Sequence, residues 1–182
     1  MMKNYILPKI FFILLTLISF SSCSSEDDEV NDNDNAGNAT YDGTSINLTQ
    51  GAIINYGEIE EGVYNFDIDL LSDDFDIDFE NQEVNGGGEN VYFEMWTSQS
   101  SGLKEGTYKM TNGEADFGIS VADFSMNYNF DTDEGTIYEA NDAELTLSKS
   151  GNTYSLDFTL SFSNGKTLTG KYEGSLYELN ED

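Results

Sequence analysis

Apolar and polar side chains alternate with a period of two through much of the chain after Tyr41. Between Tyr154 and Phe162, for example, a large apolar residue occupies every second position, with Ser, Asp or Thr between them. This pattern is typical of antiparallel β-strands with one buried face and one face in water. No segment shows a convincing helical period of 3.6 residues. The alternation therefore predicts an all-β fold.

Glycines separate many of the alternating runs, and no proline follows Pro8. We expect one domain over residues 41–182, with about nine or ten strands. Consecutive hairpins without a helical crossover predict a single antiparallel meander. Short sequential connections favour a lipocalin-like barrel, and a β-sandwich is the alternative. The expected strands lie near 44–49, 52–57, 62–71, 74–83, 90–97, 106–110, 115–130, 136–148, 153–162 and 167–178.

Turn residues allow the last two hairpins to be aligned. A three-residue loop over 163–165, with Gly165 in the left-handed conformation, places Phe158 over Gly170. A two-residue loop around Ser150-Gly151 completes a meander of three strands. The expected pairs are Leu160 with Leu168, Leu156 with Tyr172, Thr159 with Thr169, Asp157 with Lys171, Tyr154 with Gly174, Leu147 with Tyr154, and Leu145 with Leu156.

The same reasoning predicts a hairpin across residues 62–83. Its register matches apolar positions but sets carboxylates directly opposite one another on the wet face, which destabilises a sheet. The opposed pairs are Asp67 with Asp78 and Asp69 with Asp76. A structural Ca²⁺ ion would offset this repulsion, although water, salt or a neighbouring lysine would also screen it. We therefore expect no cofactor and no firm metal site, with these four carboxylates as the calcium candidates.

The charge of the chain excludes several classes of function. It has 35 Asp and Glu residues against seven lysines, and it contains neither arginine nor histidine. Such a surface repels phosphate, so nucleic acid is not an expected partner. Without histidine there is no imidazole base, no Ser-His-Asp triad and no His-ligated zinc. We expect a protein without catalytic residues.

The expected 90–97 strand carries the best candidates for ligand contact. Tyr92 and Trp96 share its polar face, with Glu94 between them. An exposed aromatic pair stacks on sugars or anchors a partner protein. The alternative is that one of the two rings covers the end of a barrel. Of the acidic residues, Glu94 most resembles a catalytic carboxylate, because aromatic residues lie on both sides of it. A glycosidase, however, needs two carboxylates at a set separation.

The first 22 residues match a secretory signal peptide. Two lysines precede an apolar run over 10–20, which as a helix would span only ~16 Å of a ~30 Å hydrocarbon core. Small residues then lead to Cys23, the only cysteine in the chain. A lone thiol in an oxidising compartment would have no partner, and attachment of lipid would remove that liability. A free cysteine after an ordinary signal peptide is the alternative.

The residues around Cys23 carry a resemblance to a known class of protein. Phe20-Ser21-Ser22-Cys23 resembles a bacterial lipobox (a type II signal peptide), and the acidic run over 26–29 resembles the surface-export signal of Bacteroidota-type lipoproteins. The pattern over 154–176 also resembles uncharacterised lipoproteins of that group. The resemblance implies acyl chains such as palmitate on Cys23, and an outer-membrane anchor with the domain facing the medium. A solvated acidic spacer on a periplasmic lipoprotein is the alternative.

Residues 23–40 are expected to be the lipidated cysteine and a flexible acidic tether, because they contain no aromatic residue and one large aliphatic side chain, Val30. The whole pattern predicts a lipid-anchored surface lipoprotein whose non-enzymatic domain binds an extracellular glycan or protein. The alternatives are a structural envelope component and a calycin-type carrier of a small apolar ligand. The carrier requires a hollow interior lined by Tyr64, Phe66, Ile68, Phe158 and Leu160.

Lipidation gives the first testable prediction. Mass spectrometry of the mature protein should find an N-terminal Cys23 that carries acyl chains, because the lipobox directs cleavage before this residue. Protease treatment of intact cells should also remove the domain. An unmodified Cys23 thiol would contradict the anchor, and a protected domain would contradict surface exposure.

Overall fold

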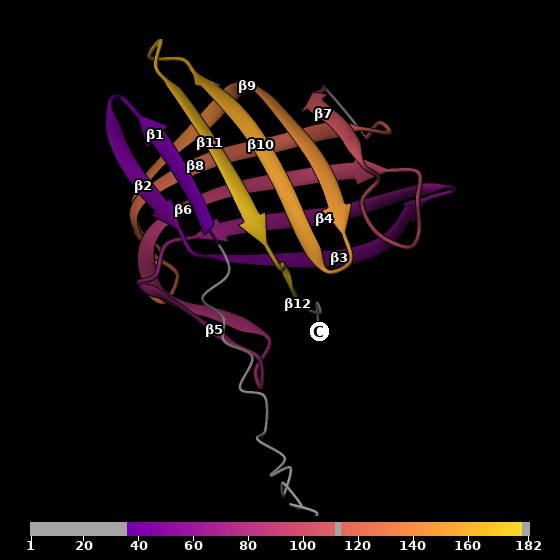
Figure 1. The fold of residues 1–182 in the computed structure, drawn as a ribbon, viewed down its shortest axis with the longest axis horizontal. Coiled ribbons are helices and arrows are strands. Elements are labelled where there is room, and N and C mark those ends of the chain that lie inside the picture. The colour runs from indigo at the N-terminus through magenta and orange to yellow at the C-terminus, as the bar shows by residue number, and fades with distance from the viewer. Residues whose placement is uncertain (1–35, 112–113, 180–182) are drawn as a thin grey trace, which may run out of the picture. The chain divides into compact units, whose positions relative to one another are not determined.

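The computed structural model describes residues 36–111 and 114–179, which form twelve β-strands and contain no α-helix (Figure 1). The all-β prediction is confirmed. The predicted signal peptide over 1–22, Cys23 and the first part of the tether lie outside the described residues. The strands are β1 (Ala36–Tyr41), β2 (Thr44–Leu48), β3 (Gln50–Glu60), β4 (Val63–Leu71), β5 (Phe75–Asp78), β6 (Glu83–Thr97), β7 (Gly106–Met110), β8 (Gly118–Asn129), β9 (Glu134–Ser150), β10 (Thr153–Phe162), β11 (Thr167–Gly174) and β12 (Tyr177–Leu179).

Eleven of these strands follow one continuous order, β12-β3-β4-β6-β8-β7-β9-β10-β11-β1-β2. β5 lies off this path and pairs with β6, and β8 also pairs directly with β9. The neighbours are antiparallel except for β12 with β3 and β7 with β8, which are parallel. The sheet is therefore mixed, and not the purely antiparallel meander that the sequence predicts.

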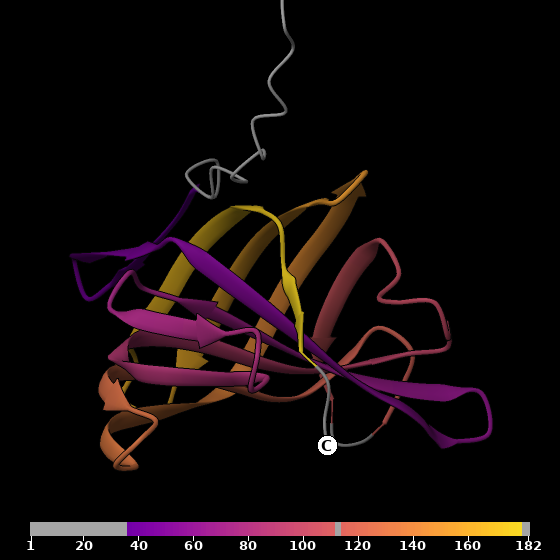
Figure 2. The ribbon, with the colours of Figure 1, turned by 90° about the horizontal axis from the view of Figure 1, so that it is seen from below.

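The sheet curls strongly into a half-barrel (Figures 1 and 2). Only Thr49 separates β2, at one end of the strand order, from β3, which is second from the other end. One residue spans at most ~3.6 Å, so these distant parts of the sheet must lie side by side. Ser175 and Leu176 join β11 to β12 in the same way. This curl agrees with the barrel-like architecture that we predict.

Aromatic side chains fill the inside of the curl. The Phe93 ring on β6 lies 5.6 Å from the Phe158 ring on β10, and the Tyr41 ring on β1 lies 5.1 Å from the Phe124 ring on β8. These strands are not neighbours in the sheet, so the rings meet across the interior. Each such burial stabilises the fold by roughly 1.5–3 kcal/mol. The largest side chains with less than 2 % exposure, or close to it, include Tyr108, Tyr172, Phe66, Phe93, Phe124 and Phe158.

A smaller apolar cluster lies on the opposite face of the sheet. Ala52 and Leu71 belong to it, and they alternate along their strands with the core residues Ile53 and Leu70. Adjacent residues of a strand point to opposite faces, so this cluster covers part of the outer face. Its other buried members are Phe75, Ile77 and Leu179.

The predicted register of the last hairpin is confirmed. Phe158 lies opposite Gly170, and Asp157 lies opposite Lys171 with 2.7 Å between Oδ2 and Nζ. Gly165 has a φ of 78°, as the three-residue loop requires. Local turn chemistry was sufficient here because the two strands are joined directly by that turn.

The register of the preceding hairpin differs by two residues from the prediction. Leu147 pairs with Leu156 rather than with Tyr154. The loop does contain two residues, but they are Gly151 and Asn152, one position later than expected. A shift of two residues leaves every side chain on its predicted face, and so the alternation alone does not distinguish the two registers.

The predicted hairpin across residues 62–83 is wrong. β4 pairs with β3 and β6, whereas β5 pairs with β6. The first part of β6 faces β5 and its later part faces β4, with Phe93 opposite Ile68. β6 has the same alternation of apolar residues as the predicted partner strand near 74–83, so this pattern does not distinguish the two as partners of β4. The acidic residues meet different neighbours: Asp67 opposes Glu94, Asp69 opposes Tyr92, Asp76 opposes Asn85, and Asp78 opposes Glu83.

β1 is a strand that the sequence did not predict. The prediction places residues 36–40 in the tether, but β1 pairs with both β11 and β2. Its sequence alternation is weak, and within residues 37–41 the buried side chains are those of Ala39 and Tyr41. The sheet therefore begins at Ala36, five residues before the predicted boundary of the domain.

The close packing of Gly170 against Phe158 gives a prediction about stability. A Cβ atom at Gly170 would lie 2.7 Å from Phe158 Cε2 and 2.9 Å from the Ala39 Cβ. Gly170→Ala should therefore lower the free energy of unfolding by about 1–3 kcal/mol, as overpacking of a core does. Urea unfolding of the full chain measures this change. The exposed neighbour substitution Thr169→Ser should have an effect below about 0.5 kcal/mol. Equal stability of Gly170→Ala and the wild type would contradict the packing described here.

Candidate functional site

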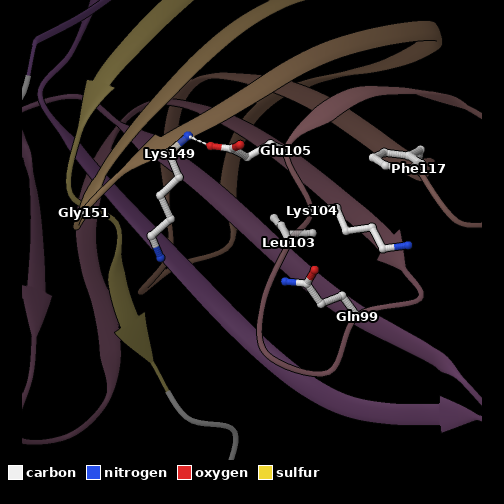
Figure 3. Close-up of a pocket in the computed structure, with 7 residues that line it drawn as sticks. All are labelled: Gln99, Leu103, Lys104, Glu105, Phe117, Lys149 and Gly151. Atoms are coloured by element: carbon white, nitrogen blue, oxygen red, sulfur yellow. Dashed lines mark hydrogen bonds between the residues drawn. The ribbon is translucent and has the colours of Figure 1, made fainter.

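A pocket of about 590 Å³ opens between the loop that joins β6 to β7 and the turn that joins β9 to β10 (Figure 3). We call it the loop pocket. Its volume lies in the range of small-ligand sites. Charged, amide and apolar side chains line it together: Gln99, Leu103, Lys104, Glu105, Phe117 and Lys149, with Gly151.

A smaller pocket of about 180 Å³ adjoins the same loop. Lys149 lines both spaces and therefore lies at the boundary between them. The smaller pocket reaches the edge of the packed core at Phe66. Its other lining residues are Ile53, Asn55, Ser101, Gly102, Tyr154, Glu178 and Leu179.

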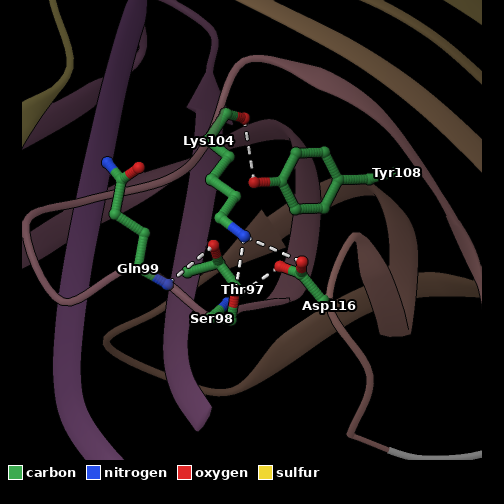
Figure 4. Close-up of polar contacts among 6 residues, drawn as sticks. All are labelled: Thr97, Ser98, Gln99, Lys104, Tyr108 and Asp116. Atoms are coloured by element: carbon green, nitrogen blue, oxygen red, sulfur yellow. Dashed lines mark hydrogen bonds and ion pairs between the residues drawn. The ribbon is translucent and has the colours of Figure 1, made fainter. Parts of the chain in front are cut away.

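A hydrogen-bond network holds the loop over 98–105 in place (Figure 4). One oxygen of Asp116 accepts the Ser98 backbone N–H at 2.8 Å, and the other accepts the Lys104 ammonium at 2.8 Å. Lys104 also donates to the Ser98 hydroxyl. The Tyr108 hydroxyl donates to the Lys104 carbonyl at 3.0 Å. The wall of the loop pocket is therefore tied to β7 and to the segment before β8.

The charge states of this network are stable near neutral pH. Burial raises the pKa of Tyr108 to about 12, despite its hydrogen bonds with Thr97 and Lys104, so its hydroxyl remains a donor. Desolvation acts to raise the pKa of Asp116, but the hydrogen bonds from Lys104 and Ser98 outweigh it and lower that pKa. Asp116 therefore remains ionised and keeps its hydrogen bonds with Ser98 and Lys104 of the loop.

Lys149 occupies a fixed position at the edge of the loop pocket. Its backbone N–H donates to Glu105 Oε1 at 2.7 Å, and its ammonium donates to the Tyr154 hydroxyl at 2.9 Å. The ammonium also lies 4.4 Å from the centre of the Tyr154 ring, which is cation–π geometry. Figure 3 shows the side chain extending away from Glu105. Glu105 thus holds the backbone of Lys149 and not its charge.

The predicted pair of Tyr92 and Trp96 shares the outer face of β6. Trp96 is only 5 % exposed, and its indole N–H donates to Ser120 Oγ at 2.6 Å. Ser120 in turn donates to Glu94 Oε2 at 2.6 Å. Hydrogen bonds between β6 and β8 therefore occupy Trp96 and Glu94, and the Trp96 ring offers little surface to a ligand.

Asp67 and Asp69 belong to a partly buried polar cluster on this outer face. Asp67 Oδ2 accepts the hydroxyls of Tyr92 at 2.8 Å and Tyr56 at 3.1 Å, and Asp69 Oδ1 accepts the Asn90 amide at 2.7 Å. Burial raises the pKa of Asp69 to about 6, although the Asn90 hydrogen bond opposes this effect, and the charge of Asp67 adds to it. Burial, followed by the neighbouring Asp67, also raises the pKa of Tyr92.

A second carboxylate on this face is perturbed in the same direction. Burial raises the pKa of Asp123 to about 6, and the charge of Glu139, which lies opposite it on β9, contributes. Its buried Oδ1 atom accepts no hydrogen bond from the described residues. Asp69 and Asp123 are thus two carboxylates that ionise near neutral pH.

The four calcium candidates do not form one group. Asp67 and Asp69 lie on β4, whereas Asp76 and Asp78 lie on β5, which does not pair with β4. Asp78 closes a turn instead: its carboxylate accepts hydrogen bonds from the backbone and side chain of Asn81, which lower its pKa. In the part of the chain that the structure describes, no group of three or more acidic or cysteine side chains is positioned to hold a metal ion. The predicted oppositions of Asp67 with Asp78 and of Asp69 with Asp76 are therefore absent, and Asp67 and Asp78 each oppose a Glu instead.

Sequence reasoning missed the loop pocket. Gln99, Lys104 and Phe117 come from two irregular segments without an alternating pattern, and Lys149 is one of the polar residues of a strand. The scarcity of lysine could have pointed to this site, because each lysine in such an acidic chain has many carboxylates with which it could pair. Only the fold shows which of the five described lysines lacks a carboxylate partner.

Comparison with known proteins does not assign the chain to a family. No protein-family model matches the chain, and neither a curated protein nor a solved structure matches it. Within the described ranges, no helix is long and apolar enough to cross a membrane.

The raised pKa of Asp69 predicts how stability depends on pH. An Asp whose folded pKa exceeds its unfolded value opposes folding at a pH above the unfolded pKa, with the full cost present above the folded pKa. Because the pKa of Asp69 rises from 3.8 to about 6 on folding, the free energy of unfolding should rise as the pH falls from about 7 to about 4. Asp69→Asn, which keeps an oxygen for Asn90, should stabilise the protein at pH 7 by about 1–2 kcal/mol and flatten this pH profile. Urea unfolding between these pH values measures both effects. Asp76→Asn, at an exposed position on β5, is the control and should leave the profile unchanged; an unchanged profile in Asp69→Asn would show that Asp69 does not carry the effect.

Proposed function

We propose that this chain is a lipid-anchored lipoprotein of the outer membrane whose β domain binds an extracellular glycan at the cell surface. The anchor is Cys23, and the evidence for it is the lipobox-like sequence that precedes this residue and the acidic run that follows. The observation that carries the binding function is the loop pocket, an open space with a polar lining beside a tightly packed core.

The packing of the interior favours surface binding over transport of an apolar ligand. A carrier would need an internal space of at least ~300 Å³. Ile68 and Leu160 are 0 % exposed, and a water-sized probe reaches almost none of Phe66 and Phe158. Residues that lined a cavity of that size would be accessible to such a probe. Four of the five predicted lining residues are thus closely packed, while the fifth, Tyr64, is partly buried against the core, and this packing supports surface binding over a carried ligand.

The lining of the loop pocket suits a saccharide. The Gln99 amide makes no hydrogen bond with the described residues through its side chain, and an amide both donates to and accepts from sugar hydroxyls. Leu103 and Phe117 supply apolar surface for the C–H face of a sugar ring. A protein partner would need an interface of roughly 800 Å² per side, whereas a saccharide needs only the contacts that this pocket offers.

The proposed function is binding without catalysis. Hydrolysis of a glycoside normally requires two carboxylates on either side of the scissile bond. Among the described residues that line the loop pocket, Glu105 is the one carboxylate, and it accepts the backbone N–H of Lys149. The lining therefore supports recognition of a sugar and not its cleavage.

Titration calorimetry tests this proposal. The full chain in detergent micelles, titrated with a panel of neutral oligosaccharides, should show saturable binding of at least one of them. Gln99→Ala should weaken this binding by roughly 3- to 10-fold, the loss of one hydrogen bond. Asn47→Ala, at an exposed position on β2, should leave the affinity unchanged. Absence of binding across the panel, and to the acidic disaccharide described below, would contradict the glycan proposal and favour a purely structural role in the envelope.

A further inference from the structure

Cations are scarce in this protein, and nearly all of those described are neutralised by an acid. The chain has seven lysines against 35 acidic residues. Four of the five lysines that the structure describes form ion pairs of 2.6–2.9 Å: Lys104 with Asp116, Lys109 with Glu144, Lys166 with Asp42, and Lys171 with Asp157. Lys149 is the described lysine without a carboxylate partner.

Lys149 lies where a ligand can reach it. Lys149 lines both pockets, and its ammonium lies 4.4 Å from the centre of the Tyr154 ring. The nearest acidic residue of the loop, Glu105, is turned toward the backbone N–H of Lys149. An ammonium has three donors, and the described residues accept one of them, through the Tyr154 hydroxyl. The remaining donors are available to a molecule in the pocket.

The charge of the whole protein limits what that molecule can be. A formal net charge of −28 repels a polyanion at long range, although salt screens this repulsion beyond about 10 Å. A single anionic group on an otherwise neutral ligand avoids most of the repulsion and still gains the contact with Lys149. Among saccharides, a sugar acid with one carboxylate has this chemistry.

We propose that Lys149 recognises the carboxylate of a singly charged, uronate-bearing saccharide in the loop pocket. This inference rests on the glycan-binding function proposed above and names its ligand class. Gln99 contacts the hydroxyls of the same ligand, while Leu103 and Phe117 lie against its ring. Lys104 stays paired with Asp116 and shapes the wall. The contact with Lys149 thus makes the loop pocket bind an acidic sugar more tightly than a neutral one.

The test compares three disaccharides that differ at one group. The probes are glucuronate linked to glucose, the methyl ester of that acid, and the disaccharide of two glucose units. Titration calorimetry of the full chain in micelles should show the acid binding about tenfold more tightly than either neutral probe. Raising the salt from about 50 to about 500 mM should reduce this difference, because ions screen the contact.

Two lysine variants locate the effect. Lys149→Met keeps an unbranched side chain but removes the charge, so in this variant the acid should bind no more tightly than the two neutral probes. Lys171→Met removes a paired lysine from the exposed face of β11 and should change nothing. Equal loss in both variants would assign the effect to net charge and overturn a site at Lys149.

The outcomes separate this inference from the function on which it rests. Equal affinity for acid and neutral disaccharides, or an unaltered preference in Lys149→Met, would overturn the role of Lys149 while glycan binding stands. If no disaccharide binds but a neutral oligosaccharide of the panel does, only the uronate specificity is overturned. If neither set binds, both proposals are wrong.

Discussion

The connection of β2 to β3 through the single residue Thr49 determines the shape of the domain. It brings opposite ends of the strand order together, and the apolar face of the sheet then closes on itself. Rings from strands that are not neighbours, such as Phe93 and Phe158, meet inside the curl. Close packing there leaves no internal binding space beside these rings. The loop pocket lies outside this packed interior, between two of the connecting segments.

The second constraint is the excess of negative charge. Most carboxylates project into water, where their repulsion is screened. On the outer face of β4, β6 and β8, however, neighbouring strands bury Asp69 and Asp123 enough to raise their pKa to about 6. Most of the described lysines are neutralised locally by an acid. Lys149 is not neutralised in this way, so its positive charge differs in sign from the acidic surface of the domain.

Predictions from the sequence succeeded where a turn joins the two strands concerned. The β10–β11 register follows from Ser163-Asn164-Gly165 and from the match of Phe158 with Gly170. The hairpin across 62–83 failed because several strands offer β4 the same alternation, and β6 was the partner in the fold. Tyr92 and Trp96 were placed on the correct common face of one strand. The contact of Trp96 with Ser120 on β8, which buries the ring, depends on a pairing that no local pattern encodes.

The sequence alone determined an all-β domain with one wet face, because side-chain alternation is local and has the period of a strand. It also determined the excess of acid and the scarcity of lysine. The tertiary structure decided which strands are neighbours, that two of the pairings are parallel, and that the interior is filled. It also decided which of the lysines in the described part of the chain lacks an acidic partner. These properties depend on contacts between residues far apart in the chain, and their free energies are comparable for several arrangements until the whole sheet is assembled.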